Sequence, residues 1–248
     1  MDPREYELMY RVEDHHWWYR GMASITRAVI QRWVRPEVPL KILDAGCGTG
    51  AAMTTYLADY GEVTGVDLYP QALEFSRKRN ARHLARASVL DLPFAPASFD
   101  LVTSFDVLYE RGVSDEIRAL NEFARVLTKS GRVLLRLPAY DWLRGQHDAR
   151  VHTNRRYTKG LVQNLLEQSG FFPEHISYAN TFLFPLAVLK RLSERFSPLK
   201  EEQSDLSMDA GWLKGIFETI LASESFFISR FGMPYGLSVM AVARKISR

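Results

Sequence analysis

The segment at residues 40–50, LKILDAGCGTG, constrains what this chain can fold into more than any other. Its first four residues are an apolar run of the kind that forms a buried parallel strand. Asp44 ends the run, and Gly46, Gly48 and Gly50 then alternate through a tight turn, where glycine permits positive φ and the close approach of a ligand. The next residues suit a helix. A strand, a glycine turn and a helix N-terminus together predict a nucleotide-sized pocket at the end of a parallel sheet.

A second acidic residue supports a nucleotide pocket. Asp67 lies seventeen residues beyond Gly50, at the end of the next strand-like run, EVTGVDL. A carboxylate at that place can accept both hydrogen bonds from a ribose diol. Two kinds of cofactor then remain, a dinucleotide and S-adenosylmethionine. The dinucleotide fingerprint is G-x-G-x-x-G, whereas this turn has the spacing G-x-G-x-G and an acid two residues before its first glycine.

This spacing resembles motif I of class I S-adenosylmethionine-dependent methyltransferases. The segment SVLDLPFAPASFDLVTSFDVL at 88–108 resembles the adenine loop and fourth strand of the same superfamily, so the resemblance covers roughly residues 40–138. It implies a Rossmann-like α/β fold, a seven-stranded, mostly parallel sheet with an antiparallel last strand and helices on both faces. It also implies S-adenosylmethionine as cofactor. The residues that we expect to contact this cofactor are Arg20, Asp44, Gly46, Gly48, Gly50, Asp67, Leu68, Ser88, Val89 and Phe105.

Two positions depart from the superfamily pattern. Many relatives carry an aspartate where Ser88 stands, and that aspartate reaches the adenine amino group; Ser88 can still form a hydrogen bond, and Asp91 is an alternative. Many relatives also carry a histidine near the end of a D-V-L-x-H motif, where this chain has Tyr109 and Glu110. A histidine base is therefore absent at that place. Glu110 could substitute for it, although we expect a solvated charge at the start of a helix.

Composition excludes several classes of protein. The chain has 248 residues, 46% of them apolar and 25% charged, which suits one large globular domain. Its net charge of +3 is too small to argue for nucleic-acid binding. The single cysteine, Cys47, excludes an internal disulfide and fits a reducing compartment. The N-terminus is too charged for a signal peptide, and no run reaches the ~18 apolar residues of a membrane span. We therefore predict a cytoplasmic protein.

The N-terminal residues 4–34 are expected to be helical and contain the aromatic segment HHWWYRGM at 15–22. Two interpretations stay open. Trp17 and Trp18 could pack the helix onto the domain while Arg20 stays solvated, or the segment could close as a lid over the cofactor or substrate, with Arg20 meeting a carboxylate such as the methionine end of the cofactor. An E-x-x-x-H-x-W-W-x-x-R-like leader resembles one found before motif I in a group of bacterial methyltransferases.

The loop at 139–158, AYDWLRGQHDARVHTNRRYT, follows the fifth predicted strand and is rich in titratable and aromatic groups. Such a loop at the ligand-binding edge of a sheet favours a functional role. Its pattern H-D-x-x-x-H-x-x-R-R-Y-T resembles a segment of the same bacterial group. The resemblance then extends over nearly the whole chain.

Methyl transfer is an in-line displacement that requires alignment and, for a hydroxyl acceptor, removal of a proton. His147 or His152 could act as the base because histidine titrates near neutral pH, and Asp148 could orient it. A histidine-aspartate-histidine set offers too few ligands at no established spacing, so we expect no metal. The predicted catalytic residues are His147, His152 and Tyr157. The predicted substrate-binding residues are Tyr109, Trp142, Arg155 and Arg156, whose arginines suit a carboxylate or phosphate.

The remaining elements complete a single domain. The patterns predict a third strand over 83–89, a helix over 114–127 with Ser114 as its N-cap and KSG at its end, and a last strand over 237–245. We divide the domain into an N-terminal helical lid, a cofactor-binding core, a C-terminal helical insertion and the last strand, at residues 1–36, 37–180, 181–234 and 235–248.

The insertion holds two apolar helical runs joined by a polar link. We favour a cap that closes a hydrophobic acceptor channel. The alternative is a peripheral contact with a membrane surface through 181–230, where Lys190, Arg191 and Arg195 flank the first run.

These features predict methyl transfer from S-adenosylmethionine to a small-molecule acceptor, a hydroxyl or carboxylate of a secondary metabolite, sugar or lipid-like compound. Nucleic acid is not expected as a partner, and the sequence does not indicate an oligomeric state. Two rival functions remain. A nicotinamide-dependent oxidoreductase would share Asp67 and the glycine turn, and a non-catalytic cofactor-binding or membrane-associated protein would keep the pocket without turnover.

Overall fold

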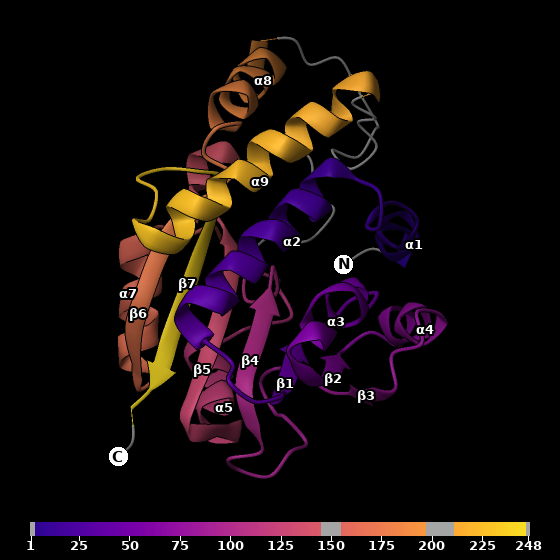
Figure 1. Cartoon of the computed structure of the whole chain (residues 1–248), viewed down its shortest axis with the longest axis vertical. Helices are drawn as coiled ribbons and strands as arrows, with labels where there is room; N and C mark the ends of the chain where they lie inside the picture. The colour runs from indigo at the N-terminus through magenta and orange to yellow at the C-terminus, as the bar shows by residue number, and fades with distance from the viewer. Residues whose placement is uncertain (1–2, 145–154, 197–210, 247–248) are drawn as a thin grey trace.

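The computed structural model describes residues 3–144, 155–196 and 211–246. Seven strands form one sheet in the order β3-β2-β1-β4-β5-β7-β6 (Figure 1). Strands β1 to β5 are parallel to one another, and β7 lies antiparallel between β5 and β6. This confirms the predicted fold class, including the antiparallel last strand. The strands are β1 Leu40–Ala45, β2 Gly61–Asp67, β3 His83–Arg86, β4 Phe99–Phe105, β5 Leu127–Pro138, β6 Phe171–Ala179 and β7 Ser238–Lys245.

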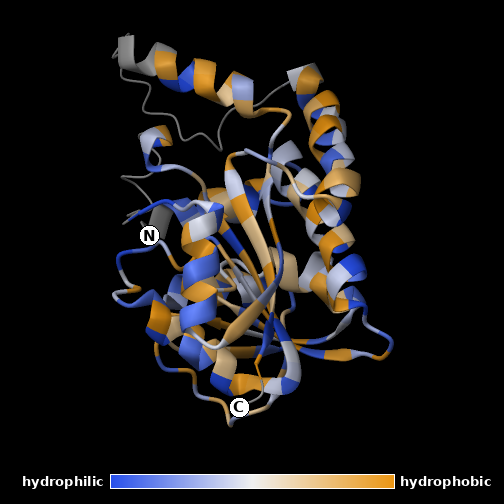
Figure 2. Cartoon of the chain, turned by 90° about the vertical axis from the view of Figure 1, so that its left-hand side faces the viewer, coloured by the Kyte–Doolittle hydropathy of each residue, from blue (hydrophilic) through white to orange (hydrophobic). Residues whose placement is uncertain are grey.

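Alternate residues of the central strands bury two separate apolar layers. Leu43 and Val102 face the layer that α5 (Glu116–Val126) and α7 (Lys159–Gln168) cover. Ile42 and Leu101 face the opposite layer, which α2 (Trp17–Val29) and α9 (Lys214–Arg230) cover. Apolar residues accordingly run along the central strands (Figure 2). Burial on both faces explains why these strands read as continuous apolar runs in the sequence.

Helices α2 and α9 come from opposite ends of the chain and lie side by side (Figure 1). A Cβ atom at Gly21 would lie 2.7 Å from the side chain of Leu221, so glycine allows this close approach. Trp17 packs against Phe217, with 5.4 Å between ring centroids. The N-terminal segment is therefore more than a lid, because most of α2 belongs to the core of the domain.

The α-helices not yet named are α1 Pro3–Val12, α3 Ala51–Thr55, α4 Pro70–Lys78 and α8 Phe184–Phe196. Helices α3 and α4 pack beside β2, and α1 packs on α4. Among the helices that the structure describes, none combines the length and apolar character required to cross a membrane.

Three predicted boundaries are wrong. Helix α5 is capped by Asp115, whose carboxylate accepts a hydrogen bond from the Arg118 N–H at 2.9 Å, and not by Ser114. The KSG segment lies within β5 instead of ending the helix, because Leu127 is fully buried and already pairs with Phe99. Strand β3 ends at Arg86 rather than at 89, since the next residues form a tight turn in which Ser88 bridges to Asp91.

We predict that Phe123→Ala lowers the free energy of unfolding by about 3–5 kcal/mol, because truncating a fully buried aromatic ring leaves a cavity. Urea unfolding measures the loss. Phe172→Ala is the matched control, since that ring is 53% exposed and its removal should cost less than about 1 kcal/mol. Equal losses for the two variants would contradict the assigned core.

Candidate functional site

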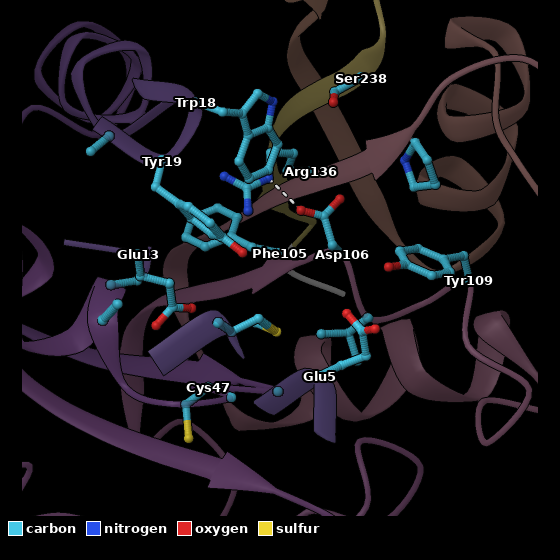
Figure 3. A pocket seen from close by; sticks show the side chains of 18 of the residues that line it. Glu5, Glu13, Trp18, Tyr19, Cys47, Phe105, Asp106, Tyr109, Arg136 and Ser238 are labelled. Carbon is cyan, nitrogen blue, oxygen red and sulfur yellow. Dashed lines mark hydrogen bonds and ion pairs between the residues drawn. The ribbon is translucent and has the colours of Figure 1, made fainter. Parts of the chain in front are cut away.

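One large pocket opens at the carboxyl ends of β1, β2, β4 and β5 (Figure 3). Its volume is about 1470 Å³. A pocket for one drug-sized ligand usually measures about 300–1,000 Å³, so this pocket has room for a nucleotide cofactor and a second small molecule. Helices α1, α2 and α8 contribute residues to its walls.

The turn after β1 forms the floor of the pocket and requires glycine. Gly46, Gly48 and Gly50 all have positive φ angles, of 85°, 55° and 81°. The N–H groups of Gly46 and Cys47 both donate to the carbonyl of Val66, at 2.8 and 2.9 Å, which ties the turn to β2. A Cβ atom at Gly46 would lie 2.2 Å from Val107, so any side chain there would displace the loop after β4.

Asp67 is held in place at the end of β2. Its Oδ2 accepts a hydrogen bond from the Gly48 N–H and its Oδ1 one from the Tyr69 N–H, both at 2.9 Å. Burial raises the pKa of Asp67, and these two hydrogen bonds oppose the rise. Each carboxylate oxygen keeps a lone pair for a further donor. The arrangement suits a ribose diol, whose two hydroxyls would meet the two oxygens.

Asp44 lies deeper, at the end of β1. It is 2% exposed and accepts a hydrogen bond from Thr103 Oγ1 at 2.8 Å. Burial raises the pKa of Asp44 to about 6. A buried carboxylate with a single side-chain donor can accept further hydrogen bonds from a ligand that carries N–H groups.

Helix α1 crosses the glycine turn and covers it. Met9 reaches to 3.9 Å from the place where a Cβ of Gly48 would lie. Beyond the end of the helix, Glu13 accepts a hydrogen bond from Thr49 and pairs with Arg79 at 3.4 Å. Arg79 also pairs with Asp14 at 2.6 Å. These contacts fix the N-terminal segment above the floor of the pocket.

A buried ion pair stands on the far side of the pocket. Arg136 of β5 donates to Asp106 at 2.6 Å, and its guanidinium lies 5.0 Å from the ring centroids of both Trp18 and Phe105 (Figure 3). Neither Arg136 nor Asp106 is among the residues predicted from the sequence. The available signal was the arginine within the apolar run VLLRLP, because a charge in a buried strand needs a partner.

Glu110 does not stay solvated, contrary to the expectation from the sequence. It lies in the pocket wall and is only partly exposed. Burial raises its pKa to about 7, and the nearby Asp67 carboxylate adds to the rise. A carboxylate with a pKa near neutrality at a pocket is a candidate for ligand binding or proton transfer.

Most of the residues expected to bind the cofactor come together in this pocket. Gly50 is an exception, since it caps α3 and does not line the pocket. Arg20 reaches the wall, but its guanidinium pairs with Glu218 of α9 at 2.9 Å. The predicted residues that line the pocket are Arg20, Asp44, Gly46, Gly48, Asp67, Leu68, Ser88, Val89, Phe105, Tyr109 and Arg156.

The loop after β5 contributes less to the pocket than expected. His147 and His152 lie outside the described residues. Tyr157 is fully buried and donates its hydroxyl to Glu116 at 2.6 Å, and Arg155 pairs with the same carboxylate. Burial and Glu116 hold the pKa of Tyr157 well above its usual range.

Trp142 is half exposed and lies beside Tyr140 and Phe184, with ring centroids 5.8 and 6.2 Å away. Neither Tyr157, Arg155 nor Trp142 lines the pocket in the described part of the chain. A polar and aromatic sequence pattern does not show which side chains turn inward to a partner such as Glu116.

The C-terminal insertion reaches the pocket through α8. Leu183, Leu186 and Ala187 supply apolar contacts, and Lys190 and Arg191 supply positive charge. That this segment closes an acceptor channel as a cap stays a prediction. Within the described ranges, no cluster of three or more histidine, cysteine, aspartate or glutamate side chains is arranged to hold a metal ion.

Comparison with known proteins finds methyltransferase matches over part of the chain. Residues 43–135 match the family described as "Methyltransferase domain". The ubiquinone/menaquinone biosynthesis C-methyltransferase UbiE of Roseobacter denitrificans is 36% identical over 126 residues, which cover 46% of this chain and 49% of UbiE. The O-methyltransferase cnsE of Penicillium expansum is 31% identical over 160 residues, 59% of this chain and 57% of cnsE. The chain thus spans about half the length of the curated relatives that it matches.

The fold agrees with these matches. Geranyl diphosphate C-methyltransferase from Streptomyces coelicolor A3(2), in complex with Mg²⁺, geranyl-S-thiolodiphosphate and S-adenosyl-L-homocysteine, superposes with a TM-score of 0.59 at 15% identity, covering 89% of this chain and 76% of that chain. This likeness shows the fold alone. The methyltransferase matches in sequence thus lie within part of the chain, with the family match at residues 43–135, and the solved structure agrees with them in fold. They do not show the bacterial group that the leader and loop motifs resemble.

We predict that Glu110→Gln gains stability relative to the wild type as the pH rises from 5 to 8. The pKa of Glu110 in the folded protein, about 7, lies above its ordinary value. The wild type therefore keeps its full stability below that ordinary pKa, where Glu110 is protonated, and loses stability as the pH rises through 7 and the buried carboxyl ionises. Urea unfolding at both pH values measures the difference. The exposed Glu74→Gln is the control and should show no such trend. The same stability difference at both pH values would contradict the burial of an ionised Glu110.

Proposed function

We propose that this protein transfers a methyl group from S-adenosylmethionine to a small-molecule acceptor. One observation carries the proposal. Backbone N–H groups fix Asp67 at the end of β2, and Asp67 lines a pocket whose floor is the glycine turn after β1. This geometry supports a ligand that has both a ribose and a part able to lie close to the backbone of the turn.

The residues present fit such a cofactor. Asp67 would hold the ribose hydroxyls, Ser88 and Val89 would meet the adenine, and Asp44 with the glycine turn would receive the amino-acid end. When bound, the cofactor supplies an electrophilic methyl group on a positively charged sulfur. The protein's own part is to align the acceptor and to exclude water, which α1 and α2 favour because their residues cover the pocket.

The pocket wall formed by α8 supports an acceptor with an apolar body. Leu183, Leu186 and Ala187 offer an apolar surface beside the basic Lys190 and Arg191. A hydroxyl or carboxylate of a secondary metabolite, sugar or lipid-like compound fits this combination, and Arg156 would bind an anionic group on it. His147 or His152 stays our proposed base for a hydroxyl acceptor. Contact of α8 and α9 with a membrane surface stays a prediction.

Calorimetric titration with S-adenosylmethionine, S-adenosylhomocysteine and NAD tests the proposal. We expect micromolar binding of the first two ligands and no binding of NAD. Asp67→Asn should weaken the binding of both by about 10- to 100-fold, because hydrogen bonds to a charged group are worth about 1.5–3 kcal/mol.

Asp100→Asn is the matched control, since Asp100 lies at the opposite end of β4 and bonds to the N–H of Lys41. It should leave both affinities within about twofold. Binding of NAD alone would overturn the methyltransferase assignment and favour an oxidoreductase.

A further inference from the structure

Glu5 of α1 is a buried carboxylate that the glycine-turn chemistry does not use. Its residue is 8% exposed, and its Oε2 has no hydrogen-bond partner among the described residues. It nevertheless lines the pocket, where Figure 3 shows it on the side of Tyr109 and Asp106 and away from Glu13. A buried polar oxygen without a hydrogen-bond partner is costly unless something else supplies a donor. The position of Glu5 therefore points to a ligand group.

Glu110 faces the same pocket from the loop after β4. It acts electrostatically on Tyr6, the neighbour of Glu5 in α1, and together with burial and Asp67 it raises the pKa of the Tyr6 hydroxyl well above its usual range. Burial raises the pKa of the Tyr19 hydroxyl, and the carboxylates of Asp106 and Glu5 add to the rise. Glu5 and Glu110 thus line the same pocket as Asp67 and Asp106.

The charges on this side of the pocket are predominantly negative. Asp106 is already paired with Arg136, and Glu13 with Arg79. The basic residues Lys190 and Arg191 come from α8, on a different wall. In a partly desolvated pocket, an unbalanced carboxylate attracts a cation more strongly than it would in water.

We propose that Glu5 and Glu110 form an anionic subsite that binds the positively charged sulfonium of the cofactor in preference to its neutral thioether product. This inference rests on the proposed function. The sulfonium is the one positive charge that disappears on methyl transfer, whereas the amino group of the amino-acid end is common to both forms. Loss of that charge would remove the attraction to the lid helix α1 and favour release of the product.

Calorimetric titration of the full chain with S-adenosylmethionine and S-adenosylhomocysteine tests the subsite without an acceptor. Glu5→Gln and Glu110→Gln should each weaken binding of S-adenosylmethionine on the order of tenfold, while binding of S-adenosylhomocysteine stays within about twofold. Sinefungin, which carries an amine in place of the methylated sulfur, should follow S-adenosylmethionine because it keeps the positive charge.

Glu7→Gln is the matched control, because Glu7 lies on the exposed side of α1 and pairs with Arg11 at 2.5 Å. It should leave both affinities unchanged. Thermal unfolding of each variant checks that the fold is kept, because glutamine matches glutamate in size.

The possible results distinguish a failure of the proposed subsite from a failure of the proposed function. Equal weakening for both ligands would overturn the subsite, because it would assign the glutamates to a group that the two ligands share. Unchanged binding in both variants would also overturn it while leaving the proposed function intact. Failure of the wild type to bind either ligand would overturn the proposed function and the subsite together.

Discussion

The left-handed turn between β1 and α3 is the constraint on which the rest of the site depends. Its backbone bonds to Val66 and to the carboxylate of Asp67, so the turn and the end of β2 have one fixed relation. Val107 packs where a side chain of Gly46 would stand, which brings the loop after β4 against the same turn. Because three parallel strands end side by side, one local conformation places acidic groups from three elements around one pocket.

The two ends of the chain close this pocket together. Helices α2 and α9 pack through the contact of Gly21 with Leu221, and the Arg20–Glu218 ion pair links their pocket-facing ends. The N-terminal segment and the insertion are thus joined to each other as well as to the sheet. A ligand in the pocket would lie on a floor whose geometry glycine fixes, and it would be enclosed in part by α1, α2 and α8, which lie outside the family match at residues 43–135.

Local patterns predicted the parts of the fold that local forces determine. The apolar run before Asp44, the alternating glycines and the last strand each depend on neighbouring residues, and the structure shows the strand, the turn and the antiparallel pairing there. The N-cap of α5 was misplaced by one residue because Ser114 and Asp115 are both good capping residues.

Tertiary partners explain what the sequence could not supply. Tyr157 and Arg155 turn toward Glu116, which lies about forty residues earlier on α5, and no local pattern indicates that pairing. Glu5 and Glu110 are likewise brought to one pocket only by the packing of α1 over the glycine turn. From the sequence alone, an acidic residue near the N-terminus is expected to be solvated.

A crystal structure of the full chain with S-adenosylhomocysteine would test the central claim most directly. The account predicts the ribose hydroxyls within hydrogen-bond distance of Asp67, the amino-acid end over Gly46 and Gly48, and α1 closed above the ligand. A ligand bound elsewhere, or one in this pocket whose ribose does not meet Asp67, would contradict it.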